Sequence, residues 1–91
     1  DWLARYGGEE FCLVMPDTDR DTGAVVAERV RRNVAGAQIL SLDQRRVPLS
    51  ASVGVAELTA EVDGPVDLVQ RASDAVLAAK NAGRNRLVIG K

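Results

Sequence analysis

The sequence predicts an α+β fold in which helices pack on a mostly antiparallel sheet. Hairpin-like pairs of strand patterns alternate with helical patterns, in the order strand, strand, helix, strand, strand, helix, strand. The composition is that of a globular protein, because 46% of the residues are hydrophobic and 27% are charged. With 91 residues, the chain can form one domain at most, or a piece of one.

Composition excludes several kinds of chemistry. The chain has no histidine and one cysteine, so histidine metal sites, Ser-His-Asp triads and internal disulfides are excluded. A net charge of −1 gives no electrostatic reason to expect nucleic acid or an anionic membrane as a partner. No apolar run could cross a bilayer, no signal peptide pattern is present, and the single cysteine fits a reducing cytoplasm. The chain begins at Asp1 rather than Met, so we expect a fragment of a longer protein.

The first predicted unit is a hairpin. Residues 2–6 alternate as in a strand, and Gly7-Gly8 suits a two-residue loop because the favoured turns need positive φ. Residues 11–15 form a continuous apolar run, which is typical of a strand buried on both faces.

The first helix is predicted over residues 22–34, where apolar residues recur with helical spacing. Thr18 or Asp19 could cap its N-terminus, and Gly36 is a plausible end. The helix carries three arginines, namely Arg29, Arg31 and Arg32.

Two more strands are predicted at residues 38–42 and 47–58. The second of them shows the clearest period-two alternation in the chain. Gly54 lies within it, which indicates close packing or the approach of another group to the backbone.

A second helix is predicted from Gly64 to about Ala82, because Gly64, Pro65 and Asp67 fit its N-cap, N1 and N3 positions and Gly83 fits its end. Its core face is expected to consist of Val69, Ala72, Val76 and Ala79. A last short strand is predicted at residues 86–89.

The stretch Gly7-Gly8-Glu9-Glu10 is the first candidate site. Glycines let a ligand approach the backbone, whose N–H groups can meet phosphate oxygens, and carboxylates can hold Mg²⁺. Because neighbours in a strand point to opposite faces, Glu9 and Glu10 should not share one role. On these four residues alone, a tight turn with two solvated glutamates is the simpler interpretation.

Lys80 and Arg84 form the second candidate site. They lie four residues apart across a helix end, and a Lys point charge with an Arg fork suits a polyphosphate. The simpler interpretation is again available, because basic residues near a helix C-terminus complement the helix dipole.

Four motifs occur in order: RYGGEEFCLVMPDT, AERVR, SASVGVAEL and AKNAGRNR. In this order and spacing, the chain resembles the C-terminal half of the GGDEF family of diguanylate cyclases, with GGEEF as its signature loop. The resemblance covers essentially residues 1–91 and implies a fold related to nucleotidyl cyclases and polymerase palms. Two positions depart from the family pattern, since Ser73 and Leu77 replace an Asp and a Tyr on the last helix.

The resemblance implies condensation of two GTP into cyclic di-GMP with release of pyrophosphate. Two domains would meet face to face as a homodimer, each holding one GTP, with Mg²⁺ or Mn²⁺ as the cofactor. By position, the resemblance places Gly7 and Gly8 in the turn that lies against GTP. It makes Glu9 the metal ligand and Glu10 the second catalytic acid. It makes Lys80 and Arg84 the phosphate-binding pair.

The resemblance also implies a product-binding inhibitory site. The family motif Arg-x-x-Asp ends six residues before the first glycine of the loop, which places Asp1 at its Asp position. Arg29 falls where the family has a second inhibitory arginine. Cyclic di-GMP would then act as a feedback inhibitor held by Asp1 and Arg29.

Three functions stay open from the sequence. The first is a cyclase domain attached to a sensory or receiver domain, cytoplasmic even if the parent is anchored in a membrane. The second is a non-catalytic module that binds GTP or cyclic di-GMP and regulates a fused or partner effector. The third, a plain α+β interaction domain, is disfavoured by four motifs in register. The family's other metal carboxylate and its guanine-binding residues would lie upstream, so the fragment alone should be inactive. A missing edge strand would leave the sheet and core exposed, so the fragment should also be unstable or prone to aggregate.

Overall fold

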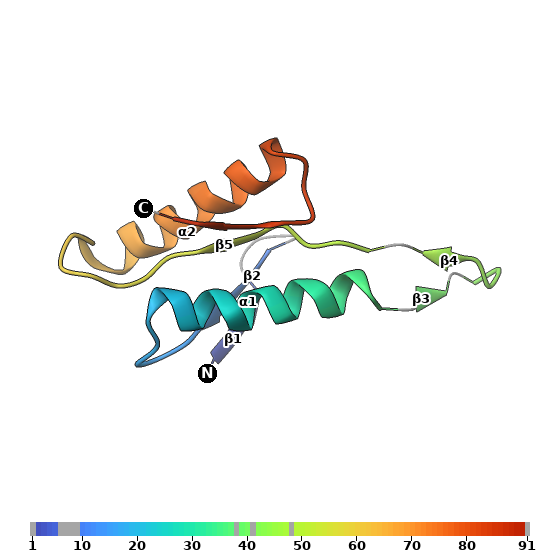
Figure 1. Cartoon of the computed structure of the whole chain (residues 1–91), viewed down its shortest axis with the longest axis horizontal. Coiled ribbons are helices and arrows are strands. Elements are labelled where there is room, and N and C mark those ends of the chain that lie inside the picture. The colour runs from blue at the N-terminus through green and yellow to red at the C-terminus, as the bar shows by residue number, and fades with distance from the viewer. Residues whose placement is uncertain (1, 6–9, 38, 41, 48, 91) are drawn as a thin grey trace.

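The computed structural model describes residues 2–5, 10–37, 39–40, 42–47 and 49–90. Its elements are, in chain order, β1 (Trp2–Arg5), β2 (Phe11–Val14), α1 (Arg20–Ala35), β3 (Ile39–Leu40), β4 (Arg46–Val47), β5 (Val53–Val55), α2 (Gly64–Asn81) and β6 (Leu87–Ile89). The predicted α+β architecture is confirmed, with β5 and β6 lying between the two helices (Figure 1).

The central strands β5 and β6 are parallel, with Val53 opposite Leu87 and Val55 opposite Ile89. They are joined through the 18-residue helix α2, and such a crossover allows two strands to run in the same direction. The prediction of a mostly antiparallel sheet is therefore not confirmed for the strands that the helices cover. The antiparallel pairs, β1 with β2 and β3 with β4, form separate two-stranded sheets within the described residues.

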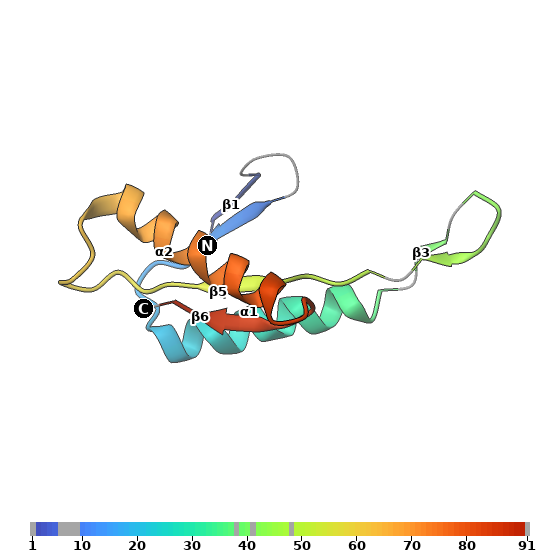
Figure 2. The same ribbon diagram turned by 90° about the horizontal axis from the view of Figure 1, so that it is seen from above.

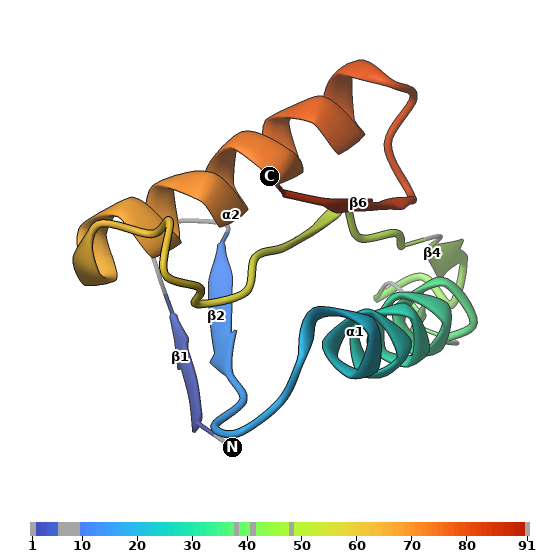
Figure 3. The same ribbon diagram turned by 60° about the vertical axis from the view of Figure 1, so that its left-hand side comes forward.

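The two helices cover opposite faces of β5. A Cβ on Gly54 would meet the backbone of α2, whereas a methyl group of Val55 lies near Gly23 of α1. Successive strand residues point to opposite faces, so α2 lies on one face of β5 and α1 on the other (Figure 3). The close packing predicted at Gly54 is confirmed.

Small side chains make up the described core. The buried hydrophobic residues are Ala27 on α1, Val55 on β5, and Ala75 and Ala79 on α2. Of the predicted core face of α2, Ala79 is buried, and the other three members are half-buried. Small residues at these positions let both helices approach the strands closely.

The β1–β2 hairpin has the predicted antiparallel pairing, with Trp2 opposite Val14 and Arg5 opposite Phe11. The prediction that residues 11–15 are buried on both faces is wrong, because Phe11 is 68% exposed. Within the described residues, β2 pairs with β1 alone and no helix packs against the hairpin.

The strand predicted over residues 47–58 is wrong in extent. Its first part belongs to β4, which forms a small hairpin with β3 far from the helices, and β5 begins only at Val53 (Figure 2). Alternation indicates which residues lie on the same face of a sheet, but not which strand they pair with. Pro48 also has no backbone N–H to donate to a neighbouring strand.

The helix ends largely follow the sequence signals. Asp19 caps α1, because its Oδ1 accepts a hydrogen bond from the Thr22 N–H at 2.7 Å. Hydrogen bonds with the backbone and the side chain of Thr22 keep the pKa of Asp19 below its usual value. Gly36 ends α1 as predicted. The N-cap of α2 is Asp63, one residue before the predicted Gly64. Within the described residues, neither helix is long and apolar enough to cross a membrane.

Candidate functional site

The turn after α2 carries Lys80 and Arg84. The Arg84 N–H donates to the Ala79 carbonyl at 2.9 Å, and the Gly83 N–H donates to the Lys80 carbonyl at 3.3 Å. These two bonds form a Schellman motif, in which Gly83 adopts a φ of 124°. Lys80 and Arg84 are thus joined through one closed turn.

Both cations are available to an anion. Lys80 is half-buried in the last turn of α2, and Arg84 is exposed on the loop beyond it. Within the part of the chain that the structure describes, neither side chain has a hydrogen-bond or ion-pair partner. The turn therefore presents two positive charges that no neighbouring carboxylate neutralises among the described residues.

The predicted metal site is described only at Glu10. This residue is half-buried and directly precedes β2, whereas Gly7, Gly8 and Glu9 lie outside the described residues. No three described Cys, Asp or Glu residues lie close enough together to hold a metal ion. Carboxylate oxygens are the ligands that Mg²⁺ prefers, so Glu9 fits the ion chemically and needs further ligands.

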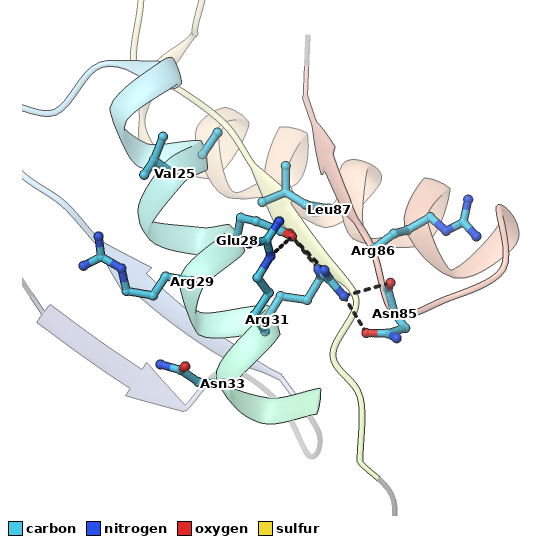
Figure 4. A pocket seen from close by; sticks show the side chains of 10 residues that line it. Val25, Glu28, Arg29, Arg31, Asn33, Asn85, Arg86 and Leu87 are labelled. Carbon is cyan, nitrogen blue, oxygen red and sulfur yellow. Dashed lines mark hydrogen bonds and ion pairs between the residues drawn. The ribbon is translucent and has the colours of Figure 1, made fainter. Parts of the chain in front are cut away.

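A cationic groove of about 780 Å³ lies between α1 and the start of β6. Arg29 and Asn33 line it from α1, and Asn85 and Leu87 line it from the other side (Figure 4). Arg29, the predicted inhibitory-site arginine, is exposed and has no hydrogen-bond or ion-pair partner among the described residues. Its predicted companion Asp1 lies outside those residues.

A hydrogen-bonded cluster borders this groove and links α1 to the turn after α2. Arg31 donates to both carboxylate oxygens of Glu28, at 2.6 and 2.7 Å, and its Nη1 donates to the side-chain oxygen of Asn85 at 2.8 Å (Figure 4). Arg32 also donates to Glu28, at 2.9 Å. The Arg31 hydrogen bonds are the main cause that lowers the pKa of Glu28 to about 2.

This cluster was not predicted from the sequence. The spacing of Glu28 to Arg31 and to Arg32 is the three- and four-residue spacing at which helical ion pairs form, so that part was accessible to a sequence argument. The bond from Arg31 to Asn85 spans 54 positions, and no local pattern reveals it.

Two helices pack on a small sheet, and the turn after α2 carries two cations, Lys80 and Arg84. Residues 1–86 match the family model described as "Diguanylate cyclase, GGDEF domain". The chain therefore belongs to the GGDEF diguanylate cyclase family.

Named relatives agree with this assignment. Diguanylate cyclase A of Treponema denticola is 34% identical over 91 residues, which make up 100% of this chain and 24% of that protein. Response regulator PleD of Caulobacter vibrioides is 40% identical over 92 residues, covering 100% of this chain and 20% of that protein. Diguanylate cyclase DgcM of Escherichia coli is 40% identical over 90 residues, covering 97% of this chain and 20% of that protein. The chain thus spans about a quarter or less of the length of these relatives.

Proposed function

We propose that the full-length protein containing this chain is a diguanylate cyclase, which condenses two GTP into cyclic di-GMP and pyrophosphate. The match of residues 1–86 to the family carries this proposal. The names of two relatives as diguanylate cyclases and the unpaired cations of the turn after α2 support it.

Lys80 and Arg84 would bind the phosphates of GTP. Phosphoryl transfer depends mainly on positioning and on neutralising charge, which a lysine and an arginine on one closed turn can supply. The chain has no histidine and therefore no imidazole base, so catalysis by positioning and charge neutralisation fits its composition. Gly7 and Gly8 would let GTP lie against the backbone of the loop.

Glu9 would be a ligand for Mg²⁺ or Mn²⁺, and Glu10 would be the second catalytic acid beside it. A bound divalent ion supplies charge neutralisation at the phosphates and eases deprotonation of the attacking 3′-hydroxyl. The carboxylate of Glu9 would hold the ion. Face-to-face pairing of two palm-like domains would bring the 3′-hydroxyl of one GTP to the α-phosphorus of the other.

Feedback by product belongs to the same proposal. Arg29 is exposed beside the groove and has no partner among the described residues, which suits an arginine that binds a phosphodiester. Cyclic di-GMP would bind Arg29 and Asp1. An input domain, such as a receiver, would control the enzyme; the relative named as a response regulator supports this part.

GTP turnover by the full-length protein with Mg²⁺ tests the proposal. Glu9→Ala should reduce turnover by about a hundredfold or more, as loss of a group that stabilises the transition state does. Glu61→Ala removes a carboxylate from a loop outside the proposed site and is the matched control. Turnover retained by Glu9→Ala would refute the metal-ligand role, and binding of GTP or cyclic di-GMP without turnover would favour the non-catalytic module.

Product inhibition gives a separate measurement on the same protein. Arg29→Ala should weaken inhibition by added cyclic di-GMP by about tenfold, because a charge-assisted bond to the ligand is lost. Unchanged inhibition would remove Arg29 from the inhibitory site without affecting the proposed cyclase activity.

A further inference from the structure

We propose that Arg31 is a positioning residue that fixes Arg84 for binding the phosphates of GTP, by tying the turn after α2 to helix α1. Arg31 itself would not touch the substrate. This inference rests on the proposed role of Arg84.

The turn that carries Arg84 has an unfavourable backbone. Arg84 and Asn85 adopt φ angles of 64° and 46°, which is the left-handed region that side-chain-bearing residues disfavour. Asn tolerates this region better than Arg does. Two successive residues in such a conformation persist only when the surrounding structure holds them, and the structure shows what holds them.

Arg31 uses all three nitrogen atoms of its guanidinium in this cluster. Nε and Nη2 donate to the two carboxylate oxygens of Glu28, at 2.6 and 2.7 Å. Nη1 donates to Asn85 twice, to its side-chain oxygen at 2.8 Å and to its backbone carbonyl at 3.2 Å. The Arg31 side chain is only 17% exposed, and its bonds to Glu28 are partly buried, whereas the two bonds to Asn85 are exposed. A lysine cannot make this set of bonds, because it presents one nitrogen instead of a planar fork.

The bonds to Asn85 act on the residue next to Arg84. On the other side of Asn85, the Arg86 carbonyl accepts from the Val53 N–H at 2.9 Å, which attaches the turn to β5. Nε of Arg86 also donates to the Arg84 carbonyl, at 3.1 Å. The backbone of Arg84 is therefore fixed by the helix end before it, by β5 after it, and by Arg31 from the side.

The Arg32 side chain supplies a matched control. It lies on the same helix and donates to the same Glu28 carboxylate at 2.9 Å, but it is 74% exposed and has no bond to the turn. Replacing either arginine with lysine keeps the charge and removes one guanidinium from Glu28. Only the replacement of Arg31 releases Asn85.

The test is a double-mutant cycle on GTP turnover by the full-length protein. Arg31→Lys should raise the KM for GTP by about tenfold, within the range of coupling between residues that share one network. Arg32→Lys should leave the KM unchanged. In an Arg84→Ala background, Arg31→Lys should have no further effect on the KM, because the group that it positions is already absent.

Each outcome decides the inference. An unchanged KM in folded Arg31→Lys, or equal effects of Arg31→Lys with and without Arg84, would overturn it. If Arg31→Lys does not fold, Asn85→Gly removes the side-chain acceptor while tolerating the left-handed backbone at this position, and its effect on the KM is measured with and without Arg84. Arg84→Ala without any effect on the KM would instead refute the proposed phosphate role. The effect of Arg84→Ala on the KM does not depend on whether Arg31 positions Arg84, so the two proposals can fail separately.

Discussion

The carboxylate of Glu28 accepts hydrogen bonds from two arginines at once, and this separates it from the other charged residues of α1. Exposed ion pairs contribute little to stability, because water screens them and ordering two long side chains costs entropy. The pair with Arg31 is bidentate, and the Arg31 side chain is largely covered. Such geometry favours the ionised carboxylate strongly, which is why the pKa of Glu28 falls to about 2.

This lowered pKa predicts a specific loss of stability in acid. A carboxyl group with a depressed folded pKa stabilises the protein above its ordinary pKa of 4.5, and that contribution is lost as the pH falls towards about 2. Glu28→Gln should therefore lower the free energy of unfolding near neutral pH and flatten its dependence on pH between these two values. Urea unfolding of the full-length protein at a series of pH values measures this dependence.

Arg29→Gln is the control for this measurement, because it removes a charge from the same helix without removing a carboxylate. It should shift the stability curve without changing its slope in the acid range. In the acid range, the free energy of unfolding of Glu28→Gln could depend on pH as steeply as that of the wild-type protein. That result would show that the ion pairs of Glu28 do not form in solution.

Two helix-ending glycines differ in backbone conformation, and this difference gives a second prediction. Gly83 follows α2 with a φ of 124°, which L side chains rarely adopt, whereas Gly36 ends α1 with a φ of −89°. Gly83→Ala should cost about 1–3 kcal/mol in the free energy of unfolding, and Gly36→Ala less than about 1 kcal/mol. Equal costs in chemical denaturation would contradict the conformation of the turn after α2.

At the scale of elements, the contact between β5 and α2 depends on one missing side chain. A Cβ at Gly54 would lie 2.6 Å from the Val76 nitrogen, and closer still to the Ala72 carbonyl oxygen. Both are backbone atoms of a helix, so neither can move alone. An alanine at this position must push α2 away from the strand pair.

Gly54→Ala should therefore lower the free energy of unfolding by at least about 2 kcal/mol, as overpacking of a tight core does. Gly23→Ala is its control, because the new methyl group would lie 3.3 Å from the flexible end of Met15 on the other face of β5. Alanine also favours a helix by about 1 kcal/mol over glycine, so the net change at Gly23 should be close to zero. A Gly54→Ala variant as stable as Gly23→Ala would contradict the packing of α2 on β5.

The helices could be predicted from the sequence more accurately than the strands. The second helix was expected from Gly64 to about Ala82 and is found at Gly64–Asn81, because capping residues and apolar spacing are local signals. The single strand expected over residues 47–58 is divided between β4 and β5. Strand pairing depends on partners that lie far away in the sequence, and alternation alone does not identify them.

In the candidate site too, local features could be predicted from the sequence and long-range contacts could not. The turn that joins Lys80 to Arg84 follows from Gly83 and could be predicted locally. The support that Arg31 gives to Asn85 connects two elements 54 positions apart, and only the fold brings them together. The residues proposed to contact substrate are therefore easier to identify from the sequence than the residue proposed to position Arg84.

At the scale of the whole molecule, the chain exposes more surface than a compact domain of its size. Its accessible surface is 6982 Å², whereas a folded monomer of this length exposes about 5,100 Å². Its radius of gyration is 14.2 Å, compared with about 12 Å for a compact domain. The β3–β4 hairpin projects from one end, and the β1–β2 hairpin is not covered by either helix (Figures 1 and 2).

One face of the β1–β2 hairpin carries three exposed apolar residues, Leu3, Phe11 and Leu13. Leu3 lies opposite Leu13, and Phe11 is two residues from Leu13 on the same face of the strand pair. Leu3 is 71% exposed and Phe11 68%. Neighbouring apolar side chains on an open sheet usually mark a surface that another segment covers, because their exposure to water is unfavourable.

A substitution on this face should have opposite effects in the 91-residue chain and in the full-length protein. In the chain alone, Phe11→Ser should reduce binding of the hydrophobic dye ANS and increase solubility, because an exposed aromatic ring is removed. In the full-length protein, the same change should lower the free energy of unfolding by roughly 2 kcal/mol or more, since a covered ring would be lost from a core. Leu77→Ser, on the exposed face of α2, is the control and should be nearly neutral in the full-length protein. If Phe11→Ser is equally neutral there, the hairpin face is ordinary surface and nothing covers it.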